Sequence, residues 1–468
     1  MNENFLELID CQPRIKEFNF VEPVNWTLKY GEVWAVTGNN GSGKTILSGI
    51  INGKYPIKTG TINYDVLSES GMAPWQGIKT ITFDSVYGLA DFGNSYYQQR
   101  WHSTGNDDMP TVYELLLKER SNLDPDILSI FGIENFFDKK INFLSSGELR
   151  KFLLTKVLIE NPKLLMIDNP YIGLDIESRK VLTEALRNLI YANKTQVIFI
   201  FSSSDNAPDF VTHILPLDKM KILPSLTYSQ FFTQKNLNLN IAEKIETVHS
   251  HESIIDMKNI SVKYGSKVII DNFNWQICKG QKWALKGGNG KGKSTILSLI
   301  NADHPQAYSN EIKIFGTRRG PGQSIWDVKK RIGYISPEMH TFYYQNIPAI
   351  DVVCSGLYDT IGNVKQYNKK EKTRSRKWFE KLEITHLKNR SFTKLSSGEQ
   401  RLVLIARTFV KEPELLILDE PLHGLDTENK IKVRKVIEDY TSNSDVTLIY
   451  VSHYENEFPG TINHIKTL

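Results

Sequence analysis

Two glycine-rich loops carry the residues best suited to chemistry. They read GNNGSGKT and GGNGKGKS, and both fit the spacing GxxxxGK[ST]. Consecutive backbone N–H groups in such a loop can point at phosphate oxygens, and glycine permits the close approach and unusual dihedral angles that this requires. The residues expected to bind phosphate are Gly38, Asn39, Asn40, Gly41, Ser42, Gly43, Lys44 and Thr45 in the first loop, and Gly287, Gly288, Asn289, Gly290, Lys291, Gly292, Lys293, Ser294 and Thr295 in the second.

The last two residues of each loop have separate roles. Lys44 and Lys293 are expected to reach the β- and γ-phosphates of a nucleotide, and Thr45 and Ser294 are expected to ligate Mg²⁺. One match to this motif could arise by chance. Two matches at equivalent points of a repeat, each between a strand and a helix, exclude chance.

An aspartate ends an apolar segment later in each copy. LLMID ends at Asp168 and LLILD ends at Asp419. An acid at the carboxyl end of a buried parallel strand lies where nucleotide and Mg²⁺ bind in this architecture. Both aspartates are therefore expected to contact Mg²⁺ and ATP.

The chain is a duplication. The segment from Asn25 recurs at Asn274, an offset of 249 residues, and the segment from Phe143 recurs at Lys394, an offset of 251. Apolar runs ending in glycine or aspartate read as buried strands and alternate with helices, which predicts in each copy a mainly parallel sheet covered on both faces. In each copy, the stretch between the phosphate loop and the second repeated segment, which begins at Phe143 or Lys394, is expected to be mainly helical. This α/β architecture predicts domain 1 at residues 1–223, a linker at 224–252 and domain 2 at 253–468.

The linker is polar and carries two lysines against three glutamates, a net charge of −1. Its HSHE cluster, at 249–252, is expected to be solvated linker, because no further Cys or His lies nearby to complete a metal site.

Composition excludes several classes of protein. The net charge of +4 over 468 residues is too balanced to require nucleic acid, and no apolar run is long enough to span a membrane. The three cysteines are odd in number and form no CxxC, which favours a reducing compartment. The acidic N-terminus is not a signal peptide. We expect a cytoplasmic protein that meets a membrane only through a partner.

Each copy also contains LSSGE, at Leu144–Glu148 and Leu395–Glu399. The order of phosphate loop, LSSGE and aspartate strand resembles the ATP-binding cassette (ABC) ATPases, twice and over nearly the whole chain. The family sequence is LSGGQ, so Ser replaces Gly and Glu replaces Gln; the added carboxylates are expected to disfavour nucleotide-driven closure slightly. The resemblance implies two tandem P-loop NTPase domains that hydrolyse ATP. Without it, LSSGE reads as a helix N-cap with an acid in the first turn.

In this family the signature of one cassette closes over the ATP held by the phosphate loop of the other. That pairing implies that Ser145 and Gly147 complete the second site, and that Ser396 and Gly398 complete the first.

The two sites are expected to be unequal. Glu420 follows the second aspartate, where the family places the residue that activates water, but Asn169 follows the first. His453 stands where the family has a histidine that contacts the γ-phosphate, and Ser203 stands at the matching point of copy one. Asparagine accepts no proton at neutral pH, and loss of a general base costs about 10²–10⁴-fold in rate. We therefore expect one catalytic site and one site that mainly binds ATP.

The residue that stacks on adenine is also asymmetric. Tyr264 lies 23 residues before Gly287, where these ATPases place an aromatic ring, and its counterpart is Ile15. Phe18 or Phe20 could take that role after a small shift. The alternative for Tyr264 is a ring packed in a sheet.

The process that ATP drives is left open by the sequence. Transporter cassettes have a glutamine after a strand, where IGYISPE has Pro337 and copy one has ITFDS. The segments DHPQAYSNEIKIFGTRRG and QSIWDVKKRIGYIS resemble the ModF type of tandem cassettes, which implies a link to molybdenum transport and a membrane permease as partner. The alternatives are a soluble translation factor, disfavoured by the short acidic linker, and a nucleotide-gated clamp. YYQQRW, at 96–101, is a candidate partner surface, with ordinary subdomain packing as the alternative.

Overall fold

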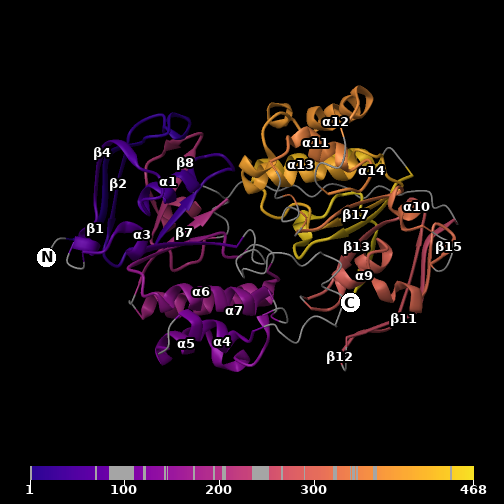
Figure 1. The fold of residues 1–468 in the computed structure, drawn as a ribbon, viewed down its shortest axis with the longest axis horizontal. Coiled ribbons are helices and arrows are strands. Elements are labelled where there is room, and N and C mark those ends of the chain that lie inside the picture. The colour runs from indigo at the N-terminus through magenta and orange to yellow at the C-terminus, as the bar shows by residue number, and fades with distance from the viewer. Residues whose placement is uncertain are drawn as a thin grey trace. The chain divides into compact units, whose positions relative to one another are not determined.

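The computed structural model describes residues 3–68, 71–83, 110–119, 123–141, 144, 146–171, 174–192, 195–202, 207–233, 252–264, 267–288, 290–319, 324–337, 339, 343, 346–361, 366–442 and 445–468. These residues form two compact units, one ending at residue 233 and one beginning at residue 252 (Figure 1). Tyr96–Trp101 and His249–His251, which drew attention in the sequence, lie outside the described residues.

The first unit contains a mainly parallel sheet in the order β10-β8-β3-β7-β6-β5 and an antiparallel sheet in the order β2-β1-β4. In the first sheet only β9 and β10 run antiparallel to their neighbour β8. The strands are β1 (Asn4–Pro13), β2 (Val24–Lys29), β3 (Trp34–Thr37), β4 (Ile57–Asn63), β5 (Ile78–Thr82), β6 (Leu164–Asp168), β7 (Gln196–Phe201), β8 (His213–Asp218), β9 (Lys221–Ile222) and β10 (Leu226–Thr227).

The second unit repeats this plan. Its parallel sheet has the order β16-β17-β18-β13-β19, which matches β5-β6-β7-β3-β8 of the first unit, and its antiparallel sheet has the order β12-β11-β14-β15. The strands are β11 (Ser253–Tyr264), β12 (Lys267–Cys278), β13 (Lys282–Lys286), β14 (Glu311–Ile314), β15 (Thr317–Arg318), β16 (Ile332–Ile335), β17 (Leu415–Asp419), β18 (Thr447–Val451) and β19 (His464–Thr467).

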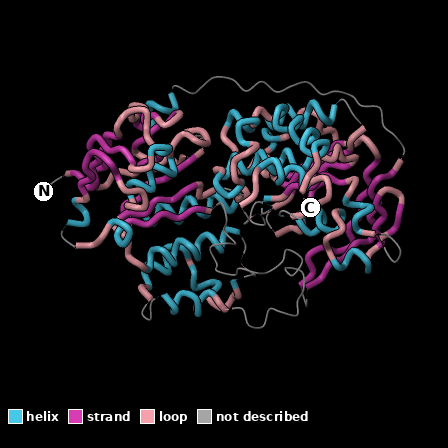
Figure 2. Tube along the Cα trace, turned by 45° about the horizontal axis from the view of Figure 1, so that its top comes forward, coloured by secondary structure: helices cyan, strands magenta, loops and turns pink. Residues whose placement is uncertain are grey.

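Helices accompany the strands in each unit (Figure 2). The first unit has α1 (Lys44–Ile51), α2 (Asp65–Ser68), α3 (Pro74–Gly77), α4 (Val112–Glu119), α5 (Pro125–Phe131), α6 (Ser146–Ile159), α7 (Ile176–Tyr191) and α8 (Tyr228–Thr233). The second has α9 (Lys293–Ile300), α10 (Ile325–Lys329), α11 (Ala349–Ser355), α12 (Lys369–Lys381), α13 (Ser397–Phe409) and α14 (Thr427–Ser442). None of the described helices is both long and apolar enough to cross a membrane.

The central strand β17 shows why the parallel sheet is apolar on both faces. Leu415 and Ile417 pack in one cluster with α9 and the antiparallel sheet. Leu416 and Leu418 pack in a second cluster with α11, α12, α13 and α14. Alternate residues of a strand point to opposite faces, so a strand covered on both sides must be apolar throughout. The predicted architecture of two α/β units, each with a mainly parallel sheet, flanking helices and a helical subdomain, is confirmed.

The stretch that the sequence places in the linker is partly structured. β10 pairs with β8, and α8 follows directly, so residues 226–233 are ordered elements of the first unit. The polar composition of this stretch gave no sign of this pairing, because Leu226–Thr227 is only two residues long and depends on β8 for its hydrogen bonds.

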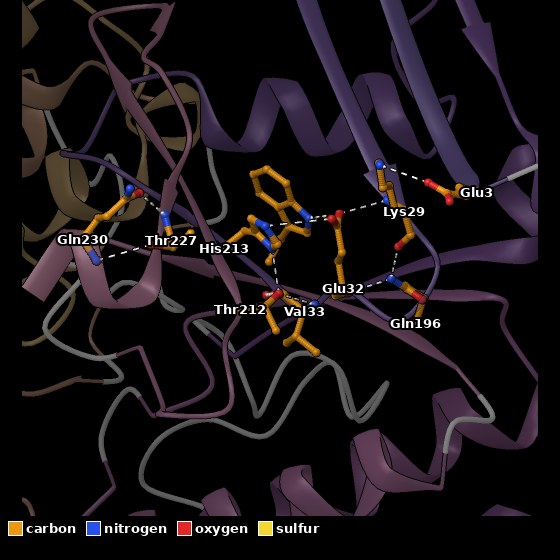
Figure 3. Close-up of polar contacts among 10 residues, drawn as sticks. Glu3, Lys29, Glu32, Val33, Gln196, Thr212, His213, Thr227 and Gln230 are labelled. Atoms are coloured by element: carbon orange, nitrogen blue, oxygen red, sulfur yellow. Dashed lines mark hydrogen bonds and ion pairs between the residues drawn. The ribbon is translucent and has the colours of Figure 1, made fainter.

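A tryptophan stacks on a histidine at the amino end of each parallel sheet. The Trp34 ring of β3 lies 4.8 Å from the His213 ring of β8, and its indole N–H donates to Glu32 at 2.8 Å. Figure 3 shows Glu32 and His213 among the polar contacts at this end of the sheet. Trp283 of β13 stacks on His464 of β19 in the same way, at 4.7 Å. Both stacks lie at the end of the sheet opposite the phosphate loops, since each loop follows the carboxyl end of the same central strand.

The signature helix α13 begins at a reciprocal hydrogen-bonded cap. The Ser396 hydroxyl accepts from the Glu399 N–H at 3.4 Å, and the Glu399 carboxylate accepts from the Ser396 N–H at 2.8 Å and from its hydroxyl at 2.9 Å. Arg390 pairs with the same carboxylate at 2.9 Å. In the first unit Lys139 pairs with Glu148 at 2.6 Å. Each added carboxylate of LSSGE is therefore balanced by a nearby cation, which the sequence analysis did not anticipate.

We expect His464→Ala to lower the free energy of unfolding by about 1 kcal/mol, because it removes the ring stacked on Trp283. Urea unfolding followed by circular dichroism measures this. His386 is exposed, so His386→Ala is the matched control and should change stability by less than about 0.5 kcal/mol. Equal effects of the two substitutions would contradict the assignment.

We expect Ser396→Ala to cost about 1 kcal/mol without any nucleotide present, because it removes the N-cap of α13. Thermal unfolding of the ligand-free protein measures the loss. The neighbouring Ser397 is exposed, and Ser397→Ala provides the control. A Ser396→Ala protein as stable as the control would show that the cap contributes little.

Candidate active site

The two phosphate-loop sequences join a parallel strand to a helix in both units. The first loop connects β3 to α1, and the second connects β13 to α9. The strands that end in Asp168 and Asp419 lie one strand away from these central strands, with β7 or β18 between them. The loops and the aspartates therefore share the carboxyl edge of each sheet, as the sequence predicts.

Three equivalent glycines have similar backbone conformations in the two loops, namely Gly38, Gly41 and Gly43 in the first and Gly287, Gly290 and Gly292 in the second. Their glycines have φ angles of 155°, 78° and 105° in the first loop and 155°, 78° and 88° in the second. Gly38 has no room for a side chain, because a Cβ there would lie 2.2 Å from the Leu217 carbonyl oxygen. A Cβ at Gly41 or Gly290 would meet nothing within 4 Å, so there the left-handed φ selects glycine.

The loop lysines cross their own loops. The Lys44 ammonium donates to the carbonyl oxygens of Gly38 and Asn39 at 2.7 and 2.9 Å. The Lys293 ammonium donates to those of Gly287 and Gly288 at 2.6 and 2.9 Å. Each lysine thus places a positive charge inside the ring of loop amides, where a phosphate group would lie.

The remaining loop residues divide between solvent and core. Thr45 and Ser294 are exposed at the first turn of their helices, whereas Thr295 is buried. The Ser42 amide donates to the Asn39 carbonyl oxygen at 3.1 Å, and the Lys291 amide to that of Gly288 at 3.4 Å. These turns tighten both loops. Asn289 lies outside the described residues.

The residue after each aspartate has an unusual backbone. Asn169 and Glu420 have φ angles of 48° and 47°. Each donates its N–H across the sheet at 2.9 Å, to the carbonyl oxygens of Ile200 and Val451 respectively. A left-handed conformation suits asparagine but costs glutamate about 1–2 kcal/mol. The second unit maintains this strain at an acid whose side chain is 16% exposed.

The side chains at this position behave differently in the two units. The Asn169 amide donates to Asp168 at 2.9 Å, and its oxygen accepts from the Ser202 N–H at 3.3 Å. The Glu420 carboxylate instead lies 3.0 Å from Nε2 of His453. The Asn169 side chain hydrogen-bonds its own strand end, whereas the side chains of Glu420 and His453 face each other.

Glu420 is ionised. Burial raises the pKa of its carboxyl, but the contact with His453 and the charges of His423, His453 and Lys293 outweigh burial and lower the pKa to about 2. At neutral pH this carboxylate is therefore charged and can accept a hydrogen bond from water.

The signature residues begin helices in both units. Ser396 caps α13, Gly398 is buried in its first turn, and Gly147 lies at the start of α6. Ser145 and Ser203 lie outside the described residues. Tyr264 is the last residue of β11, and its side chain is not among those described.

The aromatic candidates of the first unit are already packed. Phe20 is 3% exposed and lies beneath the phosphate loop, since a Cβ at Gly43 would approach its ring to 3.1 Å. Phe18 makes an edge contact with Tyr55 at 5.0 Å, and Ile15 is exposed. Phe20 therefore serves the core of the first unit and supports the loop from below.

Sequence reasoning missed the basic residues that support the second site. Arg401 hydrogen-bonds the backbone around Glu420, and His423 lies near its carboxylate. One signal was present, because Arg150 and Arg401 occupy the same position after LSSGE in both copies, 251 residues apart.

Comparisons with known proteins agree with this geometry. The ABC transporter family model matches residues 21–172 and 270–423. The ABC transporter ATP-binding protein ModF of Escherichia coli is 32% identical over 98% of this chain and 96% of its own. An uncharacterized ABC transporter ATP-binding protein of Schizosaccharomyces pombe is 29% identical over 95% of this chain and 94% of its own.

Solved structures share the fold over the whole chain. An archaeal ribosome recycling factor, aABCE1, crystallised with the ribosomal stalk protein aP1, has a TM-score of 0.57 at 19% identity, over 98% of this chain and 87% of its own. The RNase-L inhibitor has a TM-score of 0.55 at 18% identity, with the same coverage. The chain therefore belongs to the ABC transporter family, and it is an ATPase that carries two of that family's cassettes in tandem.

Proposed function

We propose that the second cassette hydrolyses ATP and that the first mainly binds it. One observation carries this proposal: at the same left-handed backbone position, Glu420 faces His453 at 3.0 Å, whereas Asn169 is hydrogen-bonded to Asp168. The ionised carboxylate would orient the attacking water and accept its proton. Asparagine cannot accept that proton.

The oxygen donors at each sheet edge fit Mg²⁺. Thr45 and Ser294 are exposed. Asp168 and Asp419 end the strands β6 and β17 at the same edge of each sheet. Mg²⁺ prefers such hydroxyl and carboxylate ligands together with phosphate oxygens, and when bound it would neutralise phosphate charge. The loop amides and the lysines would hold the β- and γ-phosphates.

The signatures complete the proposed sites in trans. Ser145 and Gly147 would act at the second phosphate loop, and Ser396 and Gly398 at the first, as the family pattern implies. Tyr264 would stack on the adenine of the second site. The Ser396 hydroxyl donates to Glu399, so binding a γ-phosphate would require it to exchange one acceptor for another.

We expect Glu420→Gln to lower kcat for ATP hydrolysis by about 10²–10⁴-fold while ATP binding persists, because only the proton acceptor is lost. Phosphate release and equilibrium binding of a fluorescent ATP analogue measure the two quantities. The equivalent Asn169→Gln should change kcat by less than about threefold. Substantial turnover by Glu420→Gln protein would refute the proposal.

For the biological role we propose the ATP-binding component of a transport system related to molybdate uptake. The support is the similarity to ModF along nearly the whole of both chains. The protein would then work in the cytoplasm, attached to the inner face of the membrane through a permease. A free-standing ATP-gated clamp is the second candidate, and Pro337 in place of the transporter glutamine favours it.

Affinity capture with Glu420→Gln protein and ATP separates these roles, because blocked hydrolysis should preserve a closed complex. Recovery of an integral membrane permease, absent when ATP is omitted, is the result expected for transport. Recovery of ribosomes, or of a soluble protein without a permease, would exclude the transport role and support the clamp.

A further inference from the structure

A buried arginine holds the backbone around the second cassette's acid. Arg401 is 6% exposed, and its guanidinium donates to four carbonyl oxygens. These belong to Glu420 at 2.6 Å, Ser336 at 2.7 Å, Asp419 at 3.1 Å and Pro421 at 3.2 Å. Arginine has five N–H donors in a rigid planar fork, so one side chain can fix several carbonyl groups at once.

Three of these carbonyls belong to consecutive residues, and the middle one carries the strained backbone. Glu420 has a φ of 47° and is held by its N–H to Val451 at 2.9 Å. Its carbonyl oxygen accepts from Arg401 and from the His423 N–H at 3.0 Å. A left-handed glutamate persists only when its surroundings over-determine it. The hydrogen bonds from Arg401 are a large part of the constraint on this backbone conformation.

Arg401 belongs to the signature helix. It lies five positions after Ser396, which caps α13. At about 1.5 Å per residue this is under two turns of a rigid helix, so the cap and the arginine move together. The same arginine also holds Ser336, the residue after β16. A rotation of α13 would therefore be transmitted to the peptide groups on both sides of the Glu420 side chain.

The first cassette has an arginine at the same position of its signature helix. Arg150 is 3% exposed on α6 and lies over the Phe83 ring at 5.4 Å. Asn169, the counterpart of Glu420, needs little support for its backbone, because asparagine adopts the left-handed conformation readily.

We propose that Arg401 is a positioning residue for ATP hydrolysis: it holds Glu420 in the conformation that faces His453 and couples that conformation to the orientation of the signature helix. This rests on the proposed function of Glu420.

The test compares Arg401→Met with Arg401→Lys in the full chain. Arg401→Met should lower kcat by about 10²-fold, the cost of a displacement of about 1 Å. ATP affinity, measured with the fluorescent analogue, should change by less than about threefold, because the phosphate loop is untouched. Arg401→Lys should retain an intermediate kcat, since one ammonium cannot reach four carbonyls.

The control is Arg407→Met on the same helix. Arg407 is also buried, but its guanidinium bonds Ser355 and Thr360. This variant should lose thermal stability, while its kcat per folded molecule stays within about threefold of wild type. An equal fall in kcat for both variants would show that general loosening of α13 is sufficient, and would overturn the proposal.

A double-variant cycle with Glu420→Gln decides whether Arg401 acts through the acid. If it does, Arg401→Met adds no further loss to the single-turnover rate of Glu420→Gln protein. A further fall of the same size would overturn the proposal, and Arg401→Lys serves in the cycle if the methionine variant does not fold. Wild-type turnover by Glu420→Gln protein would instead refute the proposed function itself.

Discussion

The parallel pairing of β17 with β18 is the constraint on which the second site depends. The register places Asp419 opposite Val451, so the residue after each strand emerges at the same edge. Glu420 and His453 meet there although 33 positions separate them in the chain. In the first unit the same register places Asp168 opposite Ile200. The edge is therefore common to both units, and only its side chains differ.

The asymmetry of the two units is local. The loops agree in their glycine φ angles, and the lysines make the same contacts. Asn169 and Glu420 agree in φ and in their backbone hydrogen bond. What changes is the partner of one side chain, from the neighbouring aspartate to a histidine across the sheet. The residue at one position thus distinguishes the two units: Asn169 hydrogen-bonds the end of its own strand, whereas Glu420 presents a carboxylate to His453.

Much of this could be predicted from the sequence, because the decisive features are short and repeated. Strand, loop and helix around Lys44 and Lys293 are contiguous, and comparison of the copies exposed Asn169 against Glu420. Other features depend on contacts that no local pattern encodes. The carbonyl groups bound by Arg401 come from two separate segments of the chain. Phe20 is recognisable as a support of the phosphate loop only once Gly43 is seen to pack on its ring. Strand β10 forms only because it pairs with β8.

The tryptophan–histidine stacks have a consequence for how such a duplicated protein can diverge. They hold the central strand to its neighbour at the amino end of each sheet, while the proposed site residues lie at the carboxyl end. Anchorage and reactivity are thus separated along the length of the same strands. One copy can lose its acid and its histidine without loosening the sheet that carried them. A duplicated cassette can in this way become a regulatory partner while remaining as well folded as the copy that still turns over.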